Sequence, residues 1–369
     1  MKKTTIYILA VLLLGFAAGC KRDADKRSAT QQMTAAEKIS AVKKFAQQMT
    51  DTIMAGDPAP LNDAIDTVAL KQRVTAIGAA LEIGAGMEIF HGNSRYGDYL
   101  LDIVENGGDF RFDTCYLRGD TAHLVLRTYD EDGSIQFDDL QLGFRDGQPV
   151  IQDAYIYSLA ADLSRKIASE TTINAFMTTD NPTEAAKNMV TVSALCKQGQ
   201  YAQMWQLLND QKSDLQQFTD YYRFYTIGMY ECSKDFLTDL EQLRADGLDE
   251  RFALYHKLCY QIGEGQADGV YATILQLMNY TGDDPIYWLL YGKTLAVARR
   301  YNDALIAYNT AKQGMDYIWD IWTGELECYA NLGDAATFHN CLSAGKHLYG
   351  MTDGELTDFT RRHFPSMAR

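Results

Sequence analysis

The sequence predicts an α+β domain, with helices on a four-stranded antiparallel meander, followed by an all-α array of stacked helical pairs. Three observations predict this order. Apolar residues recur at helical spacing before residue 77, at alternate positions between residues 109 and 157, and at helical spacing again in the remainder of the chain. A chain of 369 residues is longer than one that usually folds around a single hydrophobic core. We therefore expect two folded domains, residues 34–165 and 166–369.

The charge balance excludes one class of function. The chain has 34 basic and 49 acidic residues, which gives a formal net charge of −15. A field of this sign repels phosphate backbones, and we find no basic patch in the sequence that would overcome the repulsion. We therefore expect no nucleic-acid partner.

The first twenty residues have the features of an export signal. Two lysines precede an apolar run over residues 6–18, which is too short to span a membrane as a mature helix. Small residues at positions 17–19 lead directly to Cys20. This pattern resembles the lipobox of bacterial lipoproteins, and the resemblance implies that residues 1–19 are a signal peptide and that Cys20 carries the acyl chains. An ordinary secretory peptide with an incidental cysteine is the alternative.

Residues 20–33 predict a lipidated cysteine on a flexible tether. The segment mixes both charge signs with small polar residues and has no apolar period. Two or more acyl chains, palmitate among them, anchor a protein stably where one chain would be marginal. The lipoprotein resemblance also implies a location, because aspartate directly after the acylated cysteine favours the inner membrane and this chain has Lys21 there. We expect a membrane-attached protein of the bacterial cell envelope, at the outer membrane.

Two helices begin the first domain. Residues 34–55 place apolar side chains at helical spacing, and Thr34 with Glu37 forms a capping-box pattern at the start. Two prolines end this helix, and a second helical stretch covers residues 61–77. Glycines then interrupt the pattern as far as the Gly-Gly pair at 107–108.

Four strands follow the helices. An Asp-Gly pair at 132–133 and another at 146–147 are typical of hairpin turns, so we expect neighbouring strands to pair antiparallel. The alternating segments that predict the strands are residues 110–115, 122–127, 134–144 and 149–157.

The succession of helices and meander also carries a family resemblance. Its clearest parts are the runs at residues 138–144 and 150–157. Over residues 34–165 the chain resembles the NTF2-like, or cystatin-like, α+β cone domains of exported bacterial proteins. Members of this family include isomerases and dehydratases, whereas others only bind or dimerise, so the fold alone does not choose a function.

Polar residues on the predicted sheet offer an acid–base hypothesis. His123 and Arg127 share one strand face with Tyr129, and Asp139 or Asp153 would come from neighbouring strands. A histidine beside a carboxylate at the mouth of an apolar cone can do general acid–base work. The alternative is the solvated outer face of a twisted sheet, where alternation places polar residues anyway. We favour this alternative and assign no catalytic residue.

The second domain shows a repeat of about 34 residues. Residues 288–295 combine tryptophan, tyrosine, glycine and leucine, and residues 301–311 add alanines and tyrosines at helical spacing. Together they resemble a tetratricopeptide repeat, and the frame persists downstream and upstream. Such helical pairs cover each other's apolar faces, and the last helix, which ends at residues 361–363, has the features of a cap. A plain helical bundle is the alternative for residues 166–250.

The tetratricopeptide resemblance implies a scaffold for protein–protein interaction. Such arrays bind extended peptides or partner helices in the concave groove formed by the first helix of each pair. For the aromatic residues of this chain the alternative is packing inside the repeats, which we favour for Trp288, Tyr301 and Tyr308. The resemblance places the following residues in the groove: Tyr221, Tyr225, Tyr255, Cys259, Leu289, Lys293, Thr323, Glu327 and Asn331.

Motifs for metal or cofactor chemistry are absent from the sequence. No zinc-protease helix, nucleophile elbow, Walker loop or calcium loop occurs, and the six histidines form no pair at i and i+4. We therefore expect no metal and no cofactor. The leading hypothesis is a non-enzymatic envelope scaffold, and the alternative is a small-ligand binder or acid–base enzyme that uses the cone of the first domain.

Overall fold

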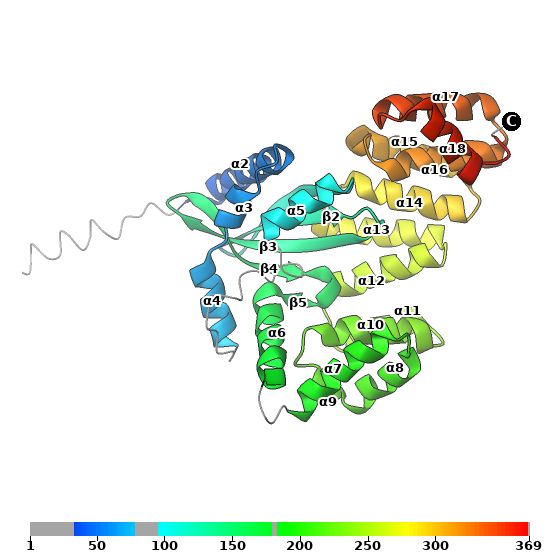
Figure 1. The fold of residues 1–369 in the computed structure, drawn as a ribbon. Coiled ribbons are helices and arrows are strands. Elements are labelled where there is room, and N and C mark those ends of the chain that lie inside the picture. Colours follow the sequence, from blue (N-terminus) through cyan, green and yellow to red (C-terminus); the bar gives the residue numbers. More distant parts are fainter. Residues whose placement is uncertain (1–32, 78–94, 179–182, 368–369) are drawn as a thin grey trace, which may run out of the picture.

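The computed structural model describes residues 33–77, 95–178 and 183–367. It shows an α+β unit with a five-stranded antiparallel sheet, followed by a helical array that runs from α7 to α18 (Figure 1). The array forms an arc, and the end of the sheet lies against its middle helices (Figure 1). The predicted signal peptide and Cys20 lie outside the described residues, as does the tether up to residue 32.

Helix α2 begins where the sequence predicts it. The Thr34 hydroxyl accepts a hydrogen bond from the Glu37 N–H, and the Glu37 carboxylate accepts one from the Thr34 N–H. Its apolar stripe, which includes Val42 and Ile53, is buried in the core beside the sheet. The helices that precede the sheet are α2 (Ala35–Met54), α3 (Ala59–Asp63), α4 (Thr67–Ala76) and α5 (Tyr96–Glu105).

The sheet has the order β1-β2-β3-β4-β5, with every neighbouring pair antiparallel. The predicted meander is confirmed, but a fifth strand exists that was not predicted. After the short helix η2 (Tyr157–Leu159), Ala160 has φ 52° and lets the chain reverse, so that β5 pairs with the end of β4. A strand this short shows no alternating pattern. The strands are β1 (Asp109–Arg118), β2 (Thr121–Tyr129), β3 (Ile135–Arg145), β4 (Gln148–Ile156) and β5 (Ala161–Asp162).

The helices after the sheet form consecutive pairs from α10 onward. The first helices of three successive pairs begin at Glu250, Pro285 and Trp319, which are 35 and 34 residues apart and so agree with the predicted repeat length. The helices are α6 (Leu163–Thr178), α7 (Glu184–Lys197), α8 (Tyr201–Asp210), α9 (Lys212–Leu215), α10 (Asp220–Cys232), α11 (Phe236–Ala245), α12 (Glu250–Gly263), α13 (Ala267–Thr281), α14 (Pro285–Val297), α15 (Tyr301–Met315), α16 (Trp319–Leu332), α17 (Ala335–Leu348) and α18 (Asp353–His363).

Helix α6 belongs to the sheet rather than to the array. Its Leu163, Ile167 and Ala168 are buried in the core that the sheet shares with α2 and α5. The predicted boundary after residue 165 therefore falls inside this helix. Within the described ranges, no helix has the length and apolar character that crossing a membrane requires.

Both faces of the sheet are covered. Leu124, Leu126 and Leu140 face the core formed with α2, α5 and α6. On the opposite face, Val125 and Phe137 belong to a core that includes residues of α12, α14 and α15. An antiparallel sheet commonly leaves one face to water, but here the array occupies it.

A tyrosine fills the contact between consecutive helical pairs. The Tyr308 ring lies against Gly292 of α14 and Gly324 of α16, where a Cβ atom would meet ring atoms at 2.7 Å and 2.5 Å. Tyr308 is buried, and Trp288 and Tyr301 are half-buried against the same core. All three aromatic residues therefore pack in the helical array, and Tyr308 does so between consecutive pairs as well as within one.

Candidate functional site

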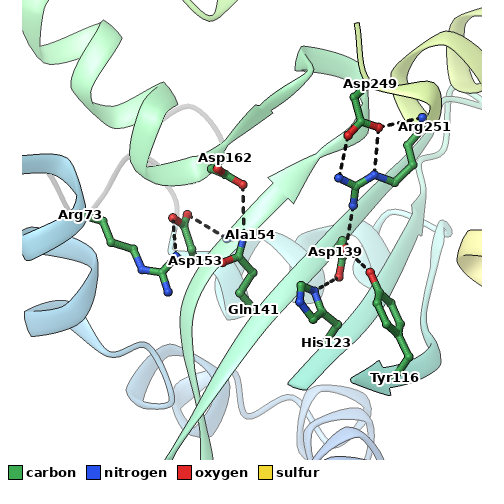
Figure 2. A network of polar contacts seen from close by, with 10 residues as sticks. All are labelled: Arg73, Tyr116, His123, Asp139, Gln141, Asp153, Ala154, Asp162, Asp249 and Arg251. Carbon is green, nitrogen blue, oxygen red and sulfur yellow. Dashed lines mark hydrogen bonds and ion pairs between the residues drawn. The ribbon is translucent and has the colours of Figure 1, made fainter. Parts of the chain in front are cut away.

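A polar network lies where the array meets the sheet (Figure 2). Asp139 of β3 is at its centre. Its Oδ1 lies 2.9 Å from Nδ1 of His123 on β2, and its Oδ2 accepts hydrogen bonds from the Tyr116 hydroxyl at 2.6 Å and from Nη1 of Arg251 at 2.8 Å. The Tyr116 and His123 rings stack, with 4.8 Å between their centroids. Three strands and helix α12 thus meet at one carboxylate.

Arg251 ties helix α12 to the sheet. Its guanidinium donates to both oxygens of Asp249, at 3.0 Å and 2.9 Å, and lies 3.7 Å from the centroid of the Tyr155 ring. Burial alone would lower the pKa of Arg251, but the hydrogen bonds and the charge of Asp249 raise it. The side chain therefore stays charged inside the interface.

His123 and Asp139 make the contact of an acid–base pair, but the structure uses them to join the sheet and the array. With Nδ1 directed at Asp139, Nε2 of His123 has no hydrogen-bond partner among the described residues. The His123 side chain is only 6% exposed, and Asp139 already binds Tyr116 and Arg251. The expectation of a solvated outer face is wrong, because the array covers this face.

Arg127 forms a second cluster in the same interface. The residue is 0% exposed, and its Nε donates to Asp284 at 2.9 Å while its Nη1 donates to Asp109 at 2.5 Å. Asp284 also caps helix α14, where it accepts a hydrogen bond from the Ile286 N–H. The Tyr317 hydroxyl, between α15 and α16, donates to Asp109. Arg127 therefore joins the sheet to the connection before α14, and Asp109 of β1 joins it to the connection before α16 through Tyr317.

Two carboxyl groups close to Arg127, Asp113 and Asp284, have pKa values shifted in opposite directions. Burial raises the pKa of Asp113 far above its ordinary value, and its hydrogen bond with Asp284 adds to the rise, although Arg111 lies 2.9 Å away. Burial opposes the charge of Asp284, but Arg127 and Asp113 outweigh burial and lower the pKa of Asp284. The raised pKa of Asp113 favours its protonated form, and the lowered pKa of Asp284 makes that carboxylate the charged partner of Arg127.

Asp153 lies in a third cluster, at the other end of the network in Figure 2. It accepts a hydrogen bond from the Ser164 hydroxyl at 2.7 Å, and its Oδ2 is 3.4 Å from Nη1 of Arg73 on α4. Arg73 also donates to Gln141, whose amide donates to Asp162. Asp153 thus holds α4 and α6 to the sheet. His123, Arg127, Asp139 and Asp153 therefore do not converge on one catalytic centre.

Eight of the nine predicted groove residues fall into three groups, and the ninth, Cys259, lines a separate pocket. Tyr221 and Leu289 are 0% exposed core residues, so their placement in an open groove is wrong. Tyr225 and Tyr255 are half-buried and bonded within the chain: Tyr225 donates to an asparagine of α8, and Tyr255 donates to the Ile135 carbonyl at 2.8 Å. The third group, on α14 and α16, is at least partly exposed and comprises Lys293, Thr323, Glu327 and Asn331.

The chain's own sheet fills the middle of the predicted binding surface. The Tyr129 hydroxyl, at the end of β2, donates to Asp320 of α16 and lies 3.3 Å from Nζ of Lys293. The turn between β2 and β3 faces the same two side chains. A repeat pattern indicates which residues face a groove, but it carries no information about a distant segment that enters it. The sequence predicts this hairpin from its Asp-Gly pair, but it does not predict that the hairpin enters the groove surface, and this is the main feature that sequence reasoning missed.

An open groove remains beside the hairpin, between α14, α16 and α18. We name it the C-terminal groove, and its volume is about 690 Å³. Its α18 wall was not predicted, because a cap pattern in the sequence does not show which face of the helix turns toward the array. The groove is lined by Lys293, Ala296, Val297, Tyr308, Trp319, Asp320, Thr323, Gly324, Glu327, Asn331, Phe359, His363 and Phe364.

A smaller pocket of about 410 Å³ lies between α10, α12 and η2, and it includes the predicted residues Tyr255 and Cys259. Desolvation by the surrounding side chains lowers the pKa of His256 to about 4 and raises the pKa of Cys259 to about 11, although Cys259 itself keeps exposed surface. Nε2 of His256 lies 3.3 Å from the Ser158 carbonyl oxygen. A neutral imidazole and a protonated thiol provide no activated nucleophile here.

Neither a metal site nor similarity to known proteins identifies a function. No group of three or more metal-ligating side chains occurs in the parts of the chain that the structure describes. Comparison of the chain with protein-family models, curated proteins and solved structures gives no match. The proposals below therefore depend on the geometry of the C-terminal groove and on the sequence features of the N-terminus.

Proposed function

We propose that the protein is a lipid-anchored scaffold of the bacterial cell envelope that binds a segment of a partner protein in the C-terminal groove. One observation carries this proposal: the groove, about 690 Å³ in volume, stays open although the hairpin fills the neighbouring surface. Both parts of the predicted fold resemblance, NTF2-like and tetratricopeptide-like, are consistent with a non-enzymatic binding role. The groove contains four residues predicted for partner binding: Lys293, Thr323, Glu327 and Asn331.

The groove offers the kind of surface that protein segments bind. Trp319 is 38% exposed and stands edge-on to Phe359, with 5.6 Å between the ring centroids. Such partly exposed aromatic faces, next to polar side chains such as Thr323 and Asn331, are typical of protein interfaces. The Lys293–Asp320 ion pair at 2.8 Å fixes one end of the groove, so binding there orders few additional side chains.

The N-terminal sequence supplies the membrane anchor in this proposal. We expect acylation at Cys20, and Lys21 supports a place at the outer membrane. A Cys20→Ser chain cannot be acylated, so it should move from the membrane fraction to the soluble fraction. Cell fractionation and mass spectrometry of the N-terminal peptide check this. A Cys20→Ser chain that remains in the membrane fraction would contradict the anchor.

Filling the C-terminal groove should weaken partner binding. The Thr323 hydroxyl donates to the Trp319 carbonyl within α16, so Thr323→Gln lengthens a side chain in the groove without breaking a tertiary contact. We expect peptides selected from a random library on the full chain to bind this variant at least about tenfold more weakly, a loss of about 1.4 kcal/mol. Fluorescence anisotropy of labelled peptides measures the difference.

Thr310→Gln is the matched control for this experiment. Thr310 makes the same intrahelical hydrogen bond on α15, to the Ile306 carbonyl at 2.9 Å, and it does not line the groove. Peptides that bind both variants equally would sink the proposal. Residues 34–165 alone cannot serve as a control, because the array covers one face of that sheet.

A further inference from the structure

Among the residues that the structure describes, Lys293 is the one lysine that lines the C-terminal groove, and its charge is already paired with Asp320. Nζ of Lys293 lies 2.8 Å from Oδ2 of Asp320 and 3.3 Å from the Tyr129 hydroxyl. Tyr129 donates to the same Asp320 carboxylate. A ligand carboxylate would have to compete with Asp320 for this ammonium group, so the groove presents no ready site for a negative charge.

Glu327 differs from Lys293 because its charged group has no partner among the described residues. It is exposed on α16 and lines the groove. Its carboxylate makes no ion pair or side-chain hydrogen bond within the described residues, whereas the backbone carbonyl of the same residue accepts a hydrogen bond from Asn331. A free carboxylate in the wall of a groove favours a ligand that carries a positive charge there.

Helix ends add to the negative potential at this end of the groove. Val297 is the last residue of α14, Asn331 lies in the last turn of α16, and His363 ends α18. The carbonyl ends of helices carry partial negative charge. Neither α14 nor α16 has a basic residue in its last turn, whereas the last turn of α18 carries Arg361, Arg362 and His363. The negative ends of α14 and α16 are therefore the ones that add to the potential at Glu327.

An apolar wall adjoins this region. Val297 is 68% exposed, and Trp319 is 38% exposed. Both line the groove together with Phe359. Exposed apolar side chains of this size bind an apolar side chain of a partner, and aromatic faces also attract cations.

We infer that the C-terminal groove recognises an internal segment of a partner protein in which a lysine or arginine lies close to an apolar anchor residue, and that it does not require a free C-terminal carboxylate. This inference rests on the proposed function and names the partner chemistry. The basic residue meets Glu327 and the helix ends, while the apolar residue packs against Val297, Trp319 and Phe359.

Charge reversal at Glu327 tests the inference. A random-peptide library whose members have no free C-terminus is selected in parallel on the wild-type full chain and on the Glu327→Lys full chain. Lysine and arginine should be enriched on the wild type and lost on the variant, which should select aspartate and glutamate. Peptides selected on the wild type should bind Glu327→Lys roughly fivefold to tenfold more weakly.

Glu105→Lys is the matched control, because it makes the same change in net charge on α5. Glu105 is exposed and makes no ion pair among the described residues. This variant should select the same peptides as the wild type. Synthetic versions of these peptides with free and with amidated C-termini should bind equally well.

The outcomes separate the two proposals. Peptides that lose affinity for Thr323→Gln but show no basic preference, or that need a free carboxylate, would overturn the inference and leave the proposed function standing. If no selected peptide depends on Thr323, both proposals fail. Circular dichroism of each variant confirms that the helical array remains folded.

Discussion

Replacing Arg127 with methionine should lower the free energy of unfolding by about 3–5 kcal/mol. The guanidinium is completely buried between Asp109 and Asp284, and methionine would leave those carboxylates in the interface without their cation. Because Asp284 also caps α14, the change should loosen the contact between the sheet and the array. Urea-induced unfolding followed by tryptophan fluorescence measures the loss.

Two further variants give this experiment its controls. Arg244 forms an exposed pair with Glu241, so Arg244→Met should change the free energy of unfolding by less than about 1 kcal/mol. Arg127→Lys keeps the charge but not the forked geometry of the guanidinium. Its loss in the free energy of unfolding should therefore lie between the losses of Arg127→Met and Arg244→Met. If Arg127→Met is no more harmful than Arg244→Met, the cluster does not hold the array to the sheet.

The sequence predicts well those features that depend on near neighbours. The capping box of Thr34 and Glu37, the two faces of β2 and the individual helices from residue 250 onward all depend on residues within a few positions of each other, and the structure shows them in place. The two-residue strand β5 escaped prediction because it is shorter than the period that would reveal it.

The interface between the two units could not be predicted in this way. Alternation places Arg127 on one face of β2, and polar residues on such a face normally meet water. Its partner Asp284 is 157 residues away in the chain, and no local pattern links them. The C-terminal groove could be predicted only in part, for the same reason. The repeat pattern places Thr323 and Glu327 in the groove, but no local pattern shows that a distant hairpin fills the adjacent surface.

Asp113→Asn should stabilise the protein near neutral pH. In the folded state the pKa of Asp113 is raised by burial and by its hydrogen bond with Asp284, whereas in the unfolded chain an aspartate has a pKa of about 3.9. Folding therefore takes up a proton at neutral pH. The protonated Asp113 contributes fully to the free energy of unfolding only below the unfolded-state pKa, and this contribution is lost as the pH rises toward the folded-state pKa. Asparagine has the shape of the protonated acid, keeps a donor for Asp284, and needs no proton.

The advantage of Asp113→Asn should consequently grow with pH. A single proton taken up on folding lowers the free energy of unfolding by up to about 1.4 kcal/mol for each unit of rising pH, until the folded-state pKa is reached. Urea unfolding of both chains between about pH 5 and about pH 8 measures this slope. Asp120→Asn is the control, because its side chain is 96% exposed and its replacement should leave the slope unchanged. A destabilised Asp113→Asn chain at neutral pH would instead show that Asp113 is ionised there and depends on its contact with Arg111.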